Sequence, residues 1–455
     1  MPPPEPVEAP ETAEAADSLD RLTPPRRGRA LRLARSAAID LSPLRHGDFR
    51  RLWTGNSIAF VGFQVTAVAV PVQVYGVSGS SFWVGMLGAV GLVPLIVFGL
   101  WGGAIADAVD RRLLLIASSL VLWGCTGALL VQALLGLRSL GLLLVLVAVQ
   151  AAAFAVASST RGAVIPRVLP PEDIASANTL SFTASTVASA AGPLLAGLVL
   201  TIWSFAAAYA LDAALFTLAL YAAVRLPSLP PLHEAEPDAD RAPARPSVPG
   251  LRSVVEGLAF ISTRPVLLLS FGVDIVAMVL AMPRALFPQA AVERFGGPGA
   301  VGWLFAAIAI GSSVAGLSSG WIRRVRRQGV ALVAAIVVWG LAIAASGLAT
   351  ALWLAVVLLA VGGAADLVSA VYRQTILQTY APDELRGRLQ GVFIVVVAGG
   401  PRLGDLRAGA MAAAVGLQAA WVGGGLACAV LVLAALLVPS FREYDATTVM
   451  TSSPR

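Results

Sequence analysis

The sequence is a succession of long apolar stretches separated by short segments that hold nearly all of its arginines. An α-helix needs about 20 predominantly apolar residues to cross the hydrocarbon layer of a bilayer, and these stretches reach that length. Membrane-spanning β-strands instead alternate polar and apolar residues over about 10 positions, which these stretches do not. Charged residues make up 13% of the chain, against about 25% in soluble domains. The sequence therefore predicts an all-α integral membrane protein.

Twelve stretches are predicted to be transmembrane helices, in two groups of six separated by a hydrophilic linker. They cover residues 52–76, 81–105, 113–136, 140–160, 180–202, 203–224, 265–288, 299–321, 329–348, 350–372, 389–411 and 417–438. The groups would form helix bundles over 44–224 and 265–440, and the linker, 225–264, combines prolines and mixed charges with a short amphipathic helix. Residues 1–43 and 441–455 would be tails, the first of them disordered because it is rich in proline, alanine and glutamate.

The placement of arginine predicts the orientation of the chain. All 32 basic residues are arginine. They concentrate before the first span, in the linker and in the loops after spans 2, 4, 8 and 10, whereas only Arg138 and Arg294 stand out on the other side. Cytoplasmic loops of membrane proteins carry an excess of basic residues. We therefore expect both termini and the linker to be cytoplasmic.

An internal repeat supports the division into halves. A shift of 212 residues superposes these pairs: Arg111 and Arg323, Arg112 and Arg324, Arg161 and Arg373, Glu172 and Glu384, Gly192 and Gly404, Gly197 and Gly409. One offset aligns four separate regions, which chance hardly supplies. The pattern predicts two parallel six-helix halves related by an axis along the membrane normal.

Several functions are excluded by composition. Without lysine, the chain has neither the lysine of a Walker A phosphate loop nor one for a pyridoxal Schiff base. Cys125 and Cys428 lie far apart within apolar stretches, so neither a disulfide nor a metal site is indicated. The positive charge lies at membrane edges, which indicates contact with lipid and not with nucleic acid. We find no convergent nucleophile, base or metal ligands, and we expect no enzymatic activity, metal or cofactor.

The loop between the second and third spans reads GGAIADAVDRRLLL. It resembles the signature loop of the major facilitator superfamily, with four residues in register: Gly103, Asp107, Arg111 and Arg112. Ala108 and Asp110 stand where that signature has a basic residue and a glycine. The resemblance implies that the loop is a conformational latch between two states of the protein.

Three further segments resemble the enterobactin exporter and macrolide-efflux-like subgroup of that superfamily. They are VAVPVQVYGVS, DIVAMVLAMPRALFP and YRQTILQTYAPDELRGRLQGV, and the resemblance extends over roughly residues 43–440. It implies the major facilitator fold, alternating access, a place in the bacterial inner or plasma membrane, and export driven by proton entry. We expect a monomeric secondary exporter of an amphipathic small molecule, such as an enterobactin-like siderophore or a drug. A macrolide or multidrug efflux pump is the main alternative, and a membrane sensor that has lost transport is the less favoured one.

Ionisable residues within spans are candidates for function, because each costs about 2.5 to 3.5 kcal/mol at the centre of a membrane helix. Asp274 and Asp366 are the predicted proton-coupling residues, since they lie on spans 7 and 10. Asp212, on the more peripheral span 6, is expected to be structural. Arg402 and Asp405 are three residues apart and are expected to pair.

In the superfamily, helices 1, 4, 7 and 10 line the substrate cavity. This implies a set of cavity residues: Asn56, Phe60, Gln64, Gln150, Arg161, Phe271, Arg284, Tyr372 and Arg373. With Phe63 and Phe154, they would suit an aromatic, partly anionic molecule. On span 5, Gly192, Pro193 and Gly197 resemble the glycine-proline signature of antiporters, which implies a hinge where a kinked helix seals against a neighbour.

Overall fold

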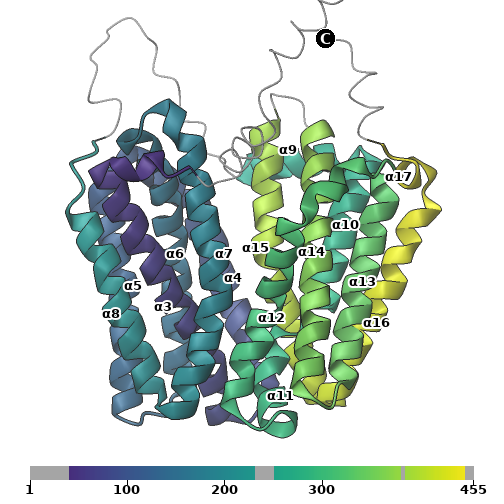
Figure 1. Cartoon of the computed structure of the whole chain (residues 1–455), viewed down its shortest axis with the longest axis horizontal. Coiled ribbons are helices and arrows are strands. Elements are labelled where there is room, and N and C mark those ends of the chain that lie inside the picture. Colours follow the sequence, from purple (N-terminus) through teal and green to yellow (C-terminus); the bar gives the residue numbers. More distant parts are fainter. Residues whose placement is uncertain (1–39, 231–250, 381–384, 446–455) are drawn as a thin grey trace, which may run out of the picture.

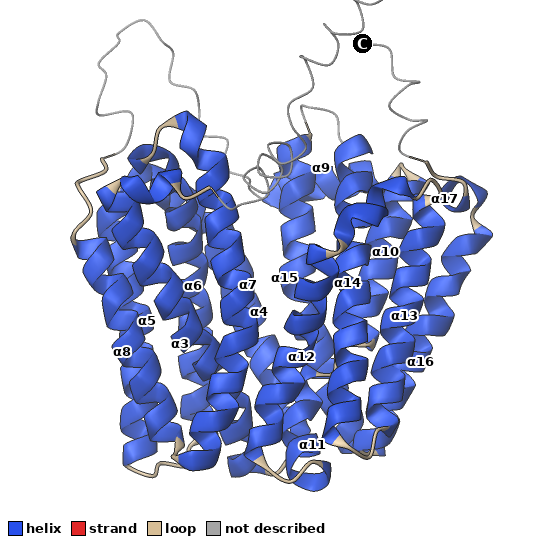
Figure 2. Ribbon diagram, viewed as in Figure 1, coloured by secondary structure: helices blue, strands red, loops and turns tan. Residues whose placement is uncertain are grey.

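The computed structural model describes residues 40–230, 251–380 and 385–445, in which every regular element is helical (Figure 2). The first half contains η1 (Ser42–Arg45), α3 (Gly47–Ser78), α4 (Ser81–Ala108), α5 (Arg111–Leu134), α6 (Leu140–Val168), α7 (Pro171–Ile202) and α8 (Phe205–Val224). The second half contains α9 (Leu251–Ser262), α10 (Pro265–Leu280), η3 (Arg284–Leu286), α11 (Phe287–Arg294), α12 (Pro298–Leu317), η4 (Ser319–Arg324), α13 (Gln328–Leu348), α14 (Leu352–Tyr380), α15 (Arg386–Val415), α16 (Leu417–Leu433), η5 (Ala434–Leu437) and α17 (Pro439–Arg442).

Eleven spans in the described ranges are long and apolar enough to cross a membrane. The remaining predicted span, 389–411, corresponds to α15, which is 30 residues long and carries Arg402, Asp405 and Arg407. Several helices continue past the predicted apolar limits. For example, α3 begins five residues before position 52, at Gly47. The short helix predicted within the linker is α9.

Short polar residues and glycine begin and end several helices. Ser80, Asp110, Ser139 and Ser204 precede α4, α5, α6 and α8, and the side chain of each accepts a hydrogen bond from a backbone N–H in the first turn. These bonds satisfy donors that a helix start leaves without a partner. Gly79 ends α3 with a φ of 64°, a left-handed conformation that glycine adopts without steric cost. The chain can therefore reverse within two or three residues.

The helices gather in two groups, α3–α8 and α10–α16 (Figure 1). We call the end where α3 begins and α8 ends the linker side, and the opposite end, with α11, the far side. The groups meet mainly through α4 against α15 and through α7 against α12. These pairs are spans 2 with 11 and 5 with 8, so exchanging the two halves turns each pair into the other. The contacts therefore have the symmetry that the sequence repeat predicts.

The repeated glycines occupy equivalent packing positions. A Cβ on Gly192 of α7 would lie 2.4 Å from Gln64 of α3, and one on Gly404 of α15 would meet the backbone of Met278 of α10. Both glycines thus bring span 5 or 11 against the first span of its own half. In membranes, small residues let helix backbones approach closely and gain van der Waals contact.

Span 7 was predicted as one helix over 265–288, but it is broken. α10 ends at Leu280, and the chain continues through η3 into α11. Pro283 and Pro288 lack the N–H groups that would bond carbonyls of the preceding turn. Arg407 of α15 supplies donors at the end of α10: its Nε donates to the carbonyl of Val279 at 3.1 Å, and its Nη2 donates to that of Leu280. The break is thus stabilised by a side chain from another helix, as backbone groups at membrane depth require.

Candidate functional site

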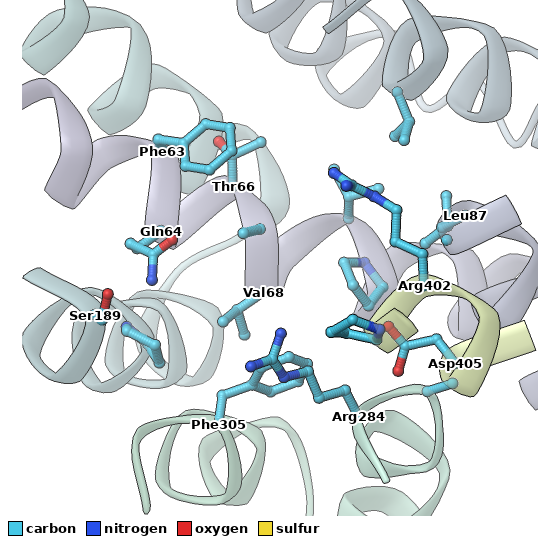
Figure 3. Close-up of a pocket in the computed structure, with 18 of the residues that line it drawn as sticks. Phe63, Gln64, Thr66, Val68, Leu87, Ser189, Arg284, Phe305, Arg402 and Asp405 are labelled. Atoms are coloured by element: carbon cyan, nitrogen blue, oxygen red, sulfur yellow. The ribbon is translucent and has the colours of Figure 1, made fainter. Parts of the chain in front are cut away.

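A cavity of about 630 Å³ lies between the two groups of helices (Figure 3). Helices α3, α4, α6 and α7 line it from one half, and η3, α12, α14 and α15 from the other. Residues that the sequence predicted for substrate or proton binding line it: Gln64, Gln150, Arg284 and Asp366. The structure adds polar and aromatic residues from spans 5, 8 and 11: Ser189, Phe305, Ser312, Arg402 and Asp405. The central cavity therefore draws on more helices than spans 1, 4, 7 and 10.

A second cavity of about 260 Å³ lies nearer the linker side and within the first half. The predicted residues Asn56, Phe60 and Arg161 line it. Nη1 of Arg161 donates to Oδ1 of Asn56 at 3.4 Å, and the guanidinium lies 6.0 Å from the ring centroid of Phe154. Among the ion pairs of the described residues, none includes Arg161. This linker-side chamber therefore offers an uncompensated positive charge to an anion.

Three phenylalanine rings separate the two cavities. Phe60 and Phe63, one turn apart on α3, stack at 6.0 Å and 17°, and Phe63 stacks on Phe154 of α6 at 5.2 Å and 13°. Phe63 lines the central cavity, Phe60 lines the linker-side chamber, and Phe154 lines both. Stacked aromatic rings bind a further ring by offset stacking or edge contact. An aromatic ligand could thus extend this stack from either chamber.

The central cavity is closed on the far side by contacts between the halves. Tyr75 of α3 donates to Glu293 of α11 at 3.2 Å, and Ser81 of α4 donates to Gln289 of α11 at 2.7 Å. Nε2 of Gln289 also donates to Glu293, at 3.0 Å. These bonds join the two halves at one end of the cavity. They would have to break before the cavity could open toward the far side.

The glycine-proline segment of α7 lies at this same closure. A Cβ on Gly197 would lie 2.9 Å from the carbonyl oxygen of Gly299, and one on Gly302 would meet the carbonyl of Pro193. Pro193 also lines the central cavity, and Gly192 lies against Gln64. The three residues predicted as a hinge therefore contact both the cavity and the opposite half.

Charged side chains cross the central cavity from the second half. Figure 3 shows the side chain of Arg284 extending away from Asp405, toward Phe305 and Val68. The predicted ion pair between Arg402 and Asp405 is not formed: their side chains diverge, and Arg402 donates to its own helix at the carbonyl of Ala398, 3.2 Å away. Among the described residues, no ion pair includes Arg284 or Arg402. This cavity thus contains two arginines able to contact a ligand.

The two predicted coupling aspartates lie in different environments. Asp274 forms an ion pair with Arg373, and both side chains are almost fully buried, at 3% and 5% exposed. Asp366 lies 4.0 Å from the same arginine, but its side chain is 33% exposed and lines the central cavity. Asp366 is therefore open to solvent and ligand, whereas Asp274 is enclosed with its partner.

Other residues predicted for the cavity lie in the core of the second half. Tyr372 is 1% exposed and donates to the carbonyl of Ile322 at 3.3 Å, and Phe271 packs edge-on against Phe393. Neither of them, nor Arg373, lines the two cavities described above. An almost wholly apolar helix gives no periodic signal of which face is turned inward, so sequence alone could not separate these residues from Arg284 or Asp366.

The predicted latch loop contacts the ends of helices in its own half. Arg111 donates to the carbonyl of Ala163 at 3.1 Å, and Arg112 to that of Val224 at 2.8 Å. The side chain of Asp107 and the surroundings of Gly103 lie outside the described part of the structure. The residue that departs from the family signature, Asp110, accepts hydrogen bonds from the Ser228 hydroxyl at 2.5 Å and from the backbone N–H of Leu229. It thereby anchors the start of the linker.

The pKa of Asp110 reflects these contacts. Partial burial acts to raise it, but the hydrogen bonds from Ser228 and from the backbone of Arg112 and Leu229 outweigh burial and bring the pKa below its ordinary value of 3.8. Asp110 is therefore a carboxylate at neutral pH, and the bonds to the linker are those of a charged acceptor.

Comparison with known proteins gives two kinds of match. A family model described as "Transmembrane secretion effector" matches residues 38–454. Curated relatives include the enterobactin exporter EntS of Citrobacter koseri and that of Shigella dysenteriae serotype 1. Each is 29% identical over 385 residues, which cover 82% of this chain and 88% of the relative.

Solved structures match over most of their length. The nucleoside transporter NupG is 13% identical, with a TM-score of 0.67, and the match covers 88% of this chain and all of NupG. A bacterial homologue of the human lysosomal transporter Spinster is 16% identical, with a TM-score of 0.68, over 91% of this chain and all of the homologue. At these identities the likeness concerns the fold alone.

Proposed function

Because the chain belongs to the transmembrane secretion effector family of the major facilitator superfamily, we propose that it exports an aromatic, partly anionic small molecule in exchange for protons. It is a secondary transporter with the major facilitator fold, and it is related to exporters. Three parts of this proposal go beyond the family: the substrate class, the proton coupling and the direction of transport. Each is supported by a separate observation.

The proposal rests mainly on the three stacked phenylalanine rings, which lie between the chamber that contains Arg161 and the central cavity that contains Arg284. A molecule that places a ring against Phe63 or Phe154 could direct an anionic group toward Arg161 on one side or Arg284 on the other. Hydrogen bonds between a guanidinium and an anion are shorter and stronger than neutral ones, and arginine also binds ring faces. Catecholate siderophores combine rings with acidic hydroxyls, and the curated relatives are named enterobactin exporters. A siderophore of this kind is therefore the favoured substrate.

A multidrug exporter is the second candidate, because the central cavity also has extensive apolar lining, including Val68, Leu87 and Ile308. A lipophilic molecule could bind there through apolar contact alone. The two candidates differ in what they require of Arg161: a catecholate uses its charge, and a neutral drug does not.

The direction of transport rests on the closure at the far side and on the arginine distribution. The cavity residues lie between the far-side contacts and the linker-side chamber along α3, α6 and α7. If the linker is cytoplasmic, as the arginines predict, this conformation accepts its substrate from the cytoplasm. Cysteines placed at Ser80 and Ser440, after replacement of Cys125 and Cys428, should label from opposite sides of the membrane.

Of the two predicted coupling residues, Asp366 is favoured. A coupling carboxylate must exchange its proton with water or substrate, and Asp366 lines the central cavity whereas Asp274 is enclosed beside Arg373. An ion pair buried in this way is strongly destabilised when either partner is removed, which favours a structural role for Asp274.

Transport into inside-out membrane vesicles tests the proposal. Enterobactin and a neutral lipophilic dye would be supplied outside, with a pH gradient imposed or collapsed. We expect gradient-dependent accumulation of enterobactin, and none in vesicles without the protein. Accumulation of the dye alone would favour the multidrug candidate, and gradient-independent accumulation of both would rule out proton exchange.

A further inference from the structure

Asp212 of α8 is a buried carboxyl in the first half, remote from the two predicted coupling residues. It is 2% exposed, and its Oδ2 accepts hydrogen bonds from Thr66 of α3 at 2.6 Å and from Thr126 of α5 at 3.2 Å. Its Oδ1 is buried without a hydrogen-bond partner. The sequence predicted a structural role for this residue. Its partners, however, do not resemble those of a structural ion pair.

No positive charge compensates this carboxyl among the described residues. None of their ion pairs includes Asp212. The helices packed on α8 are chiefly α3 and α5, with fewer contacts from α7. Arginines on α3 and α5 are confined to their linker-side ends: the nearest, Arg51 and Arg112, precede Thr66 and Thr126 by 15 and 14 residues, roughly 21 to 22 Å along a helix. The acidic residues of α7, Glu172 and Asp173, lie at its linker-side start.

The other titratable side chains near Asp212 are neutral groups. Tyr209, one turn earlier on α8, donates to Gln73 at 2.6 Å, and Cys125 precedes Thr126 on α5. An isolated carboxylate in apolar surroundings loses much of the solvation that stabilises its charge, and it takes up a proton instead. In this conformation the environment of Asp212 therefore favours the neutral acid.

Two routes of polar groups connect Asp212 with the central cavity. Thr66, its direct partner, lines that cavity. Gln150 also lines it and donates to the hydroxyl of Thr126 at 3.4 Å. In the neutral acid, the carboxyl O–H can donate to one of the two threonine oxygens. After the proton has left to water in the cavity, both hydroxyls can rotate to donate to the carboxylate.

The sequence repeat shows which position of the second half corresponds to the surroundings of Asp212. The offset of 212 residues places Asp274 on Gly62 and Asp366 on Phe154, while Arg373 falls on Arg161. A Cβ on Gly62 would lie 2.6 Å from Oδ1 of Asp212, so this carboxyl occupies space left by the missing side chain. The first half thus has a carboxyl near the position equivalent to Asp274, but without a paired arginine.

We propose that Asp212 is a second proton-binding site, protonated in this conformation and in exchange with the central cavity through Thr66. The inference rests on the proposed function in one respect: the proton bound here would be one of those exchanged for substrate. The binding of the proton itself requires no substrate, so it can be tested separately.

Infrared spectroscopy of the purified protein in lipid vesicles provides that test. At neutral pH, the wild type should show the carbonyl stretch of protonated carboxylic acid. Asp212→Asn should lose one component of this band, and the control Asp366→Asn, which is expected to unfold like the wild type, should retain that component. The Thr66→Val variant, which loses the hydroxyl but keeps the shape, should shift this band and slow its exchange in D₂O. A band that Asp212→Asn leaves unchanged would overturn the proposal.

Two further outcomes remain distinguishable. If Asp212→Asn does not accumulate in the membrane, a band in Thr66→Val with the wild-type frequency and exchange rate would overturn the assignment. If the band belongs to Asp212 but Asp212→Asn exchanges as many protons per enterobactin as the wild type, the site is not part of coupling. If the export proposal is wrong and the assignment of Asp212 is right, the vesicles should show no transport, while the infrared band should still depend on Asp212.

Discussion

At the scale of single residues, the two halves treat equivalent arginines differently. Arg373 pairs with Asp274 in the second half, whereas Arg161, at the equivalent position of the repeat, contacts Asn56 and the ring of Phe154. One arginine is neutralised inside the protein, and the other remains available to a ligand. Arginine therefore stabilises the fold in the second half and, in our proposal, binds the substrate in the first half.

Replacement of Asp274 should destabilise the protein, because it leaves the buried Arg373 with only the more distant carboxylate of Asp366, 4.0 Å away. Asp274→Asn is expected to lower the free energy of unfolding by about 3 to 5 kcal/mol, and the double variant Asp274→Asn with Arg373→Gln should recover much of it. Thermal unfolding in detergent measures both effects. Asp366→Asn is the comparison: it should unfold like the wild type, stop gradient-driven export and preserve substrate exchange. Normal gradient-driven export by Asp366→Asn would place the coupling site elsewhere.

Replacement of Arg161 should affect anionic substrates selectively. A hydrogen bond to a charged group contributes about 1.5 to 3 kcal/mol, so Arg161→Gln is expected to weaken enterobactin binding roughly 10- to 100-fold. Binding of a neutral lipophilic dye should change little. Arg225→Gln is a matched control, since Arg225 contacts Tyr221 at the end of α8 and lines neither cavity. Equal losses for enterobactin and the dye would refute charge recognition by Arg161.

The cavity could be predicted from the sequence only in part. Gln64, Gln150, Arg284 and Asp366 were identifiable because polar residues are rare and costly in apolar spans. Their roles remain predictions. The sequence could not show that Arg402 and Asp405 diverge, because pairing at a spacing of three residues depends on what the neighbouring helices offer to each side chain.

At the scale of helices, the break in span 7 shows what apolar length cannot predict. Pro71, Pro94, Pro166, Pro193 and Pro401 all lie inside continuous helices. A proline therefore does not by itself mark an end. The break after Leu280 is accompanied by donors from Arg407, which is 127 residues away in the sequence, and by Gly424 of α16, which leaves space for that guanidinium.

Replacement of Arg407 should therefore destabilise the second half. Arg407→Met keeps the apolar stem but leaves carbonyls of Val279 and Leu280 without donors, at a cost of about 1 to 3 kcal/mol for each buried unsatisfied group. Thermal unfolding should show the loss. Arg402→Met, which removes a guanidinium bonded only to its own helix, should unfold near the wild-type temperature. Equal stability of the two variants would refute the stabilising role of Arg407.

The anchor between Asp110 and the start of the linker should depend on pH. The pKa of Asp110 is lower in the folded protein than its ordinary value of 3.8, so the carboxylate stabilises the fold above that value and loses its contribution as pH falls through the folded pKa. Asp110→Asn should consequently lower the unfolding temperature at neutral pH. The difference from the wild type should vanish in acid. A difference that is the same at both pH values would show that charge is not involved.

At the scale of the whole molecule, glycines determine where the halves can meet. Gly85 of α4 approaches Gly409 of α15, and Gly197 of α7 approaches Gly302 of α12. These two crossings are equivalent under exchange of the halves, and both lie beyond the cavity on the far side. The two-bundle organisation and its symmetry could be predicted from the apolar stretches and the offset of 212 residues. The side on which the bundles close could not, since the same sequence must permit both states.

A methyl group at one crossing should shift the protein toward the opposite state. In Gly302→Ala, the new Cβ would meet the carbonyl of Pro193, so the halves must separate on the far side. A cysteine placed at Ser189, in the background without Cys125 and Cys428, should then react faster with an impermeant reagent from the far side. Gly272→Ala, where a Cβ would meet nothing within 4 Å, is the control and should not change the rate. An unchanged rate in Gly302→Ala would show that this crossing does not determine the closure.

The three stacked phenylalanines all belong to the first half, two on α3 and one on α6. A substrate ring held on this stack would move with the first half. The second half, with Asp366 and the broken span 7, would move relative to it. Choice of substrate would then depend on the residues around the rings, whereas proton exchange would depend on carboxyls, Asp366 in the second half and, in our proposal, Asp212 in the first. A lineage could acquire a new substrate through substitutions around the rings and keep the same proton-binding residues.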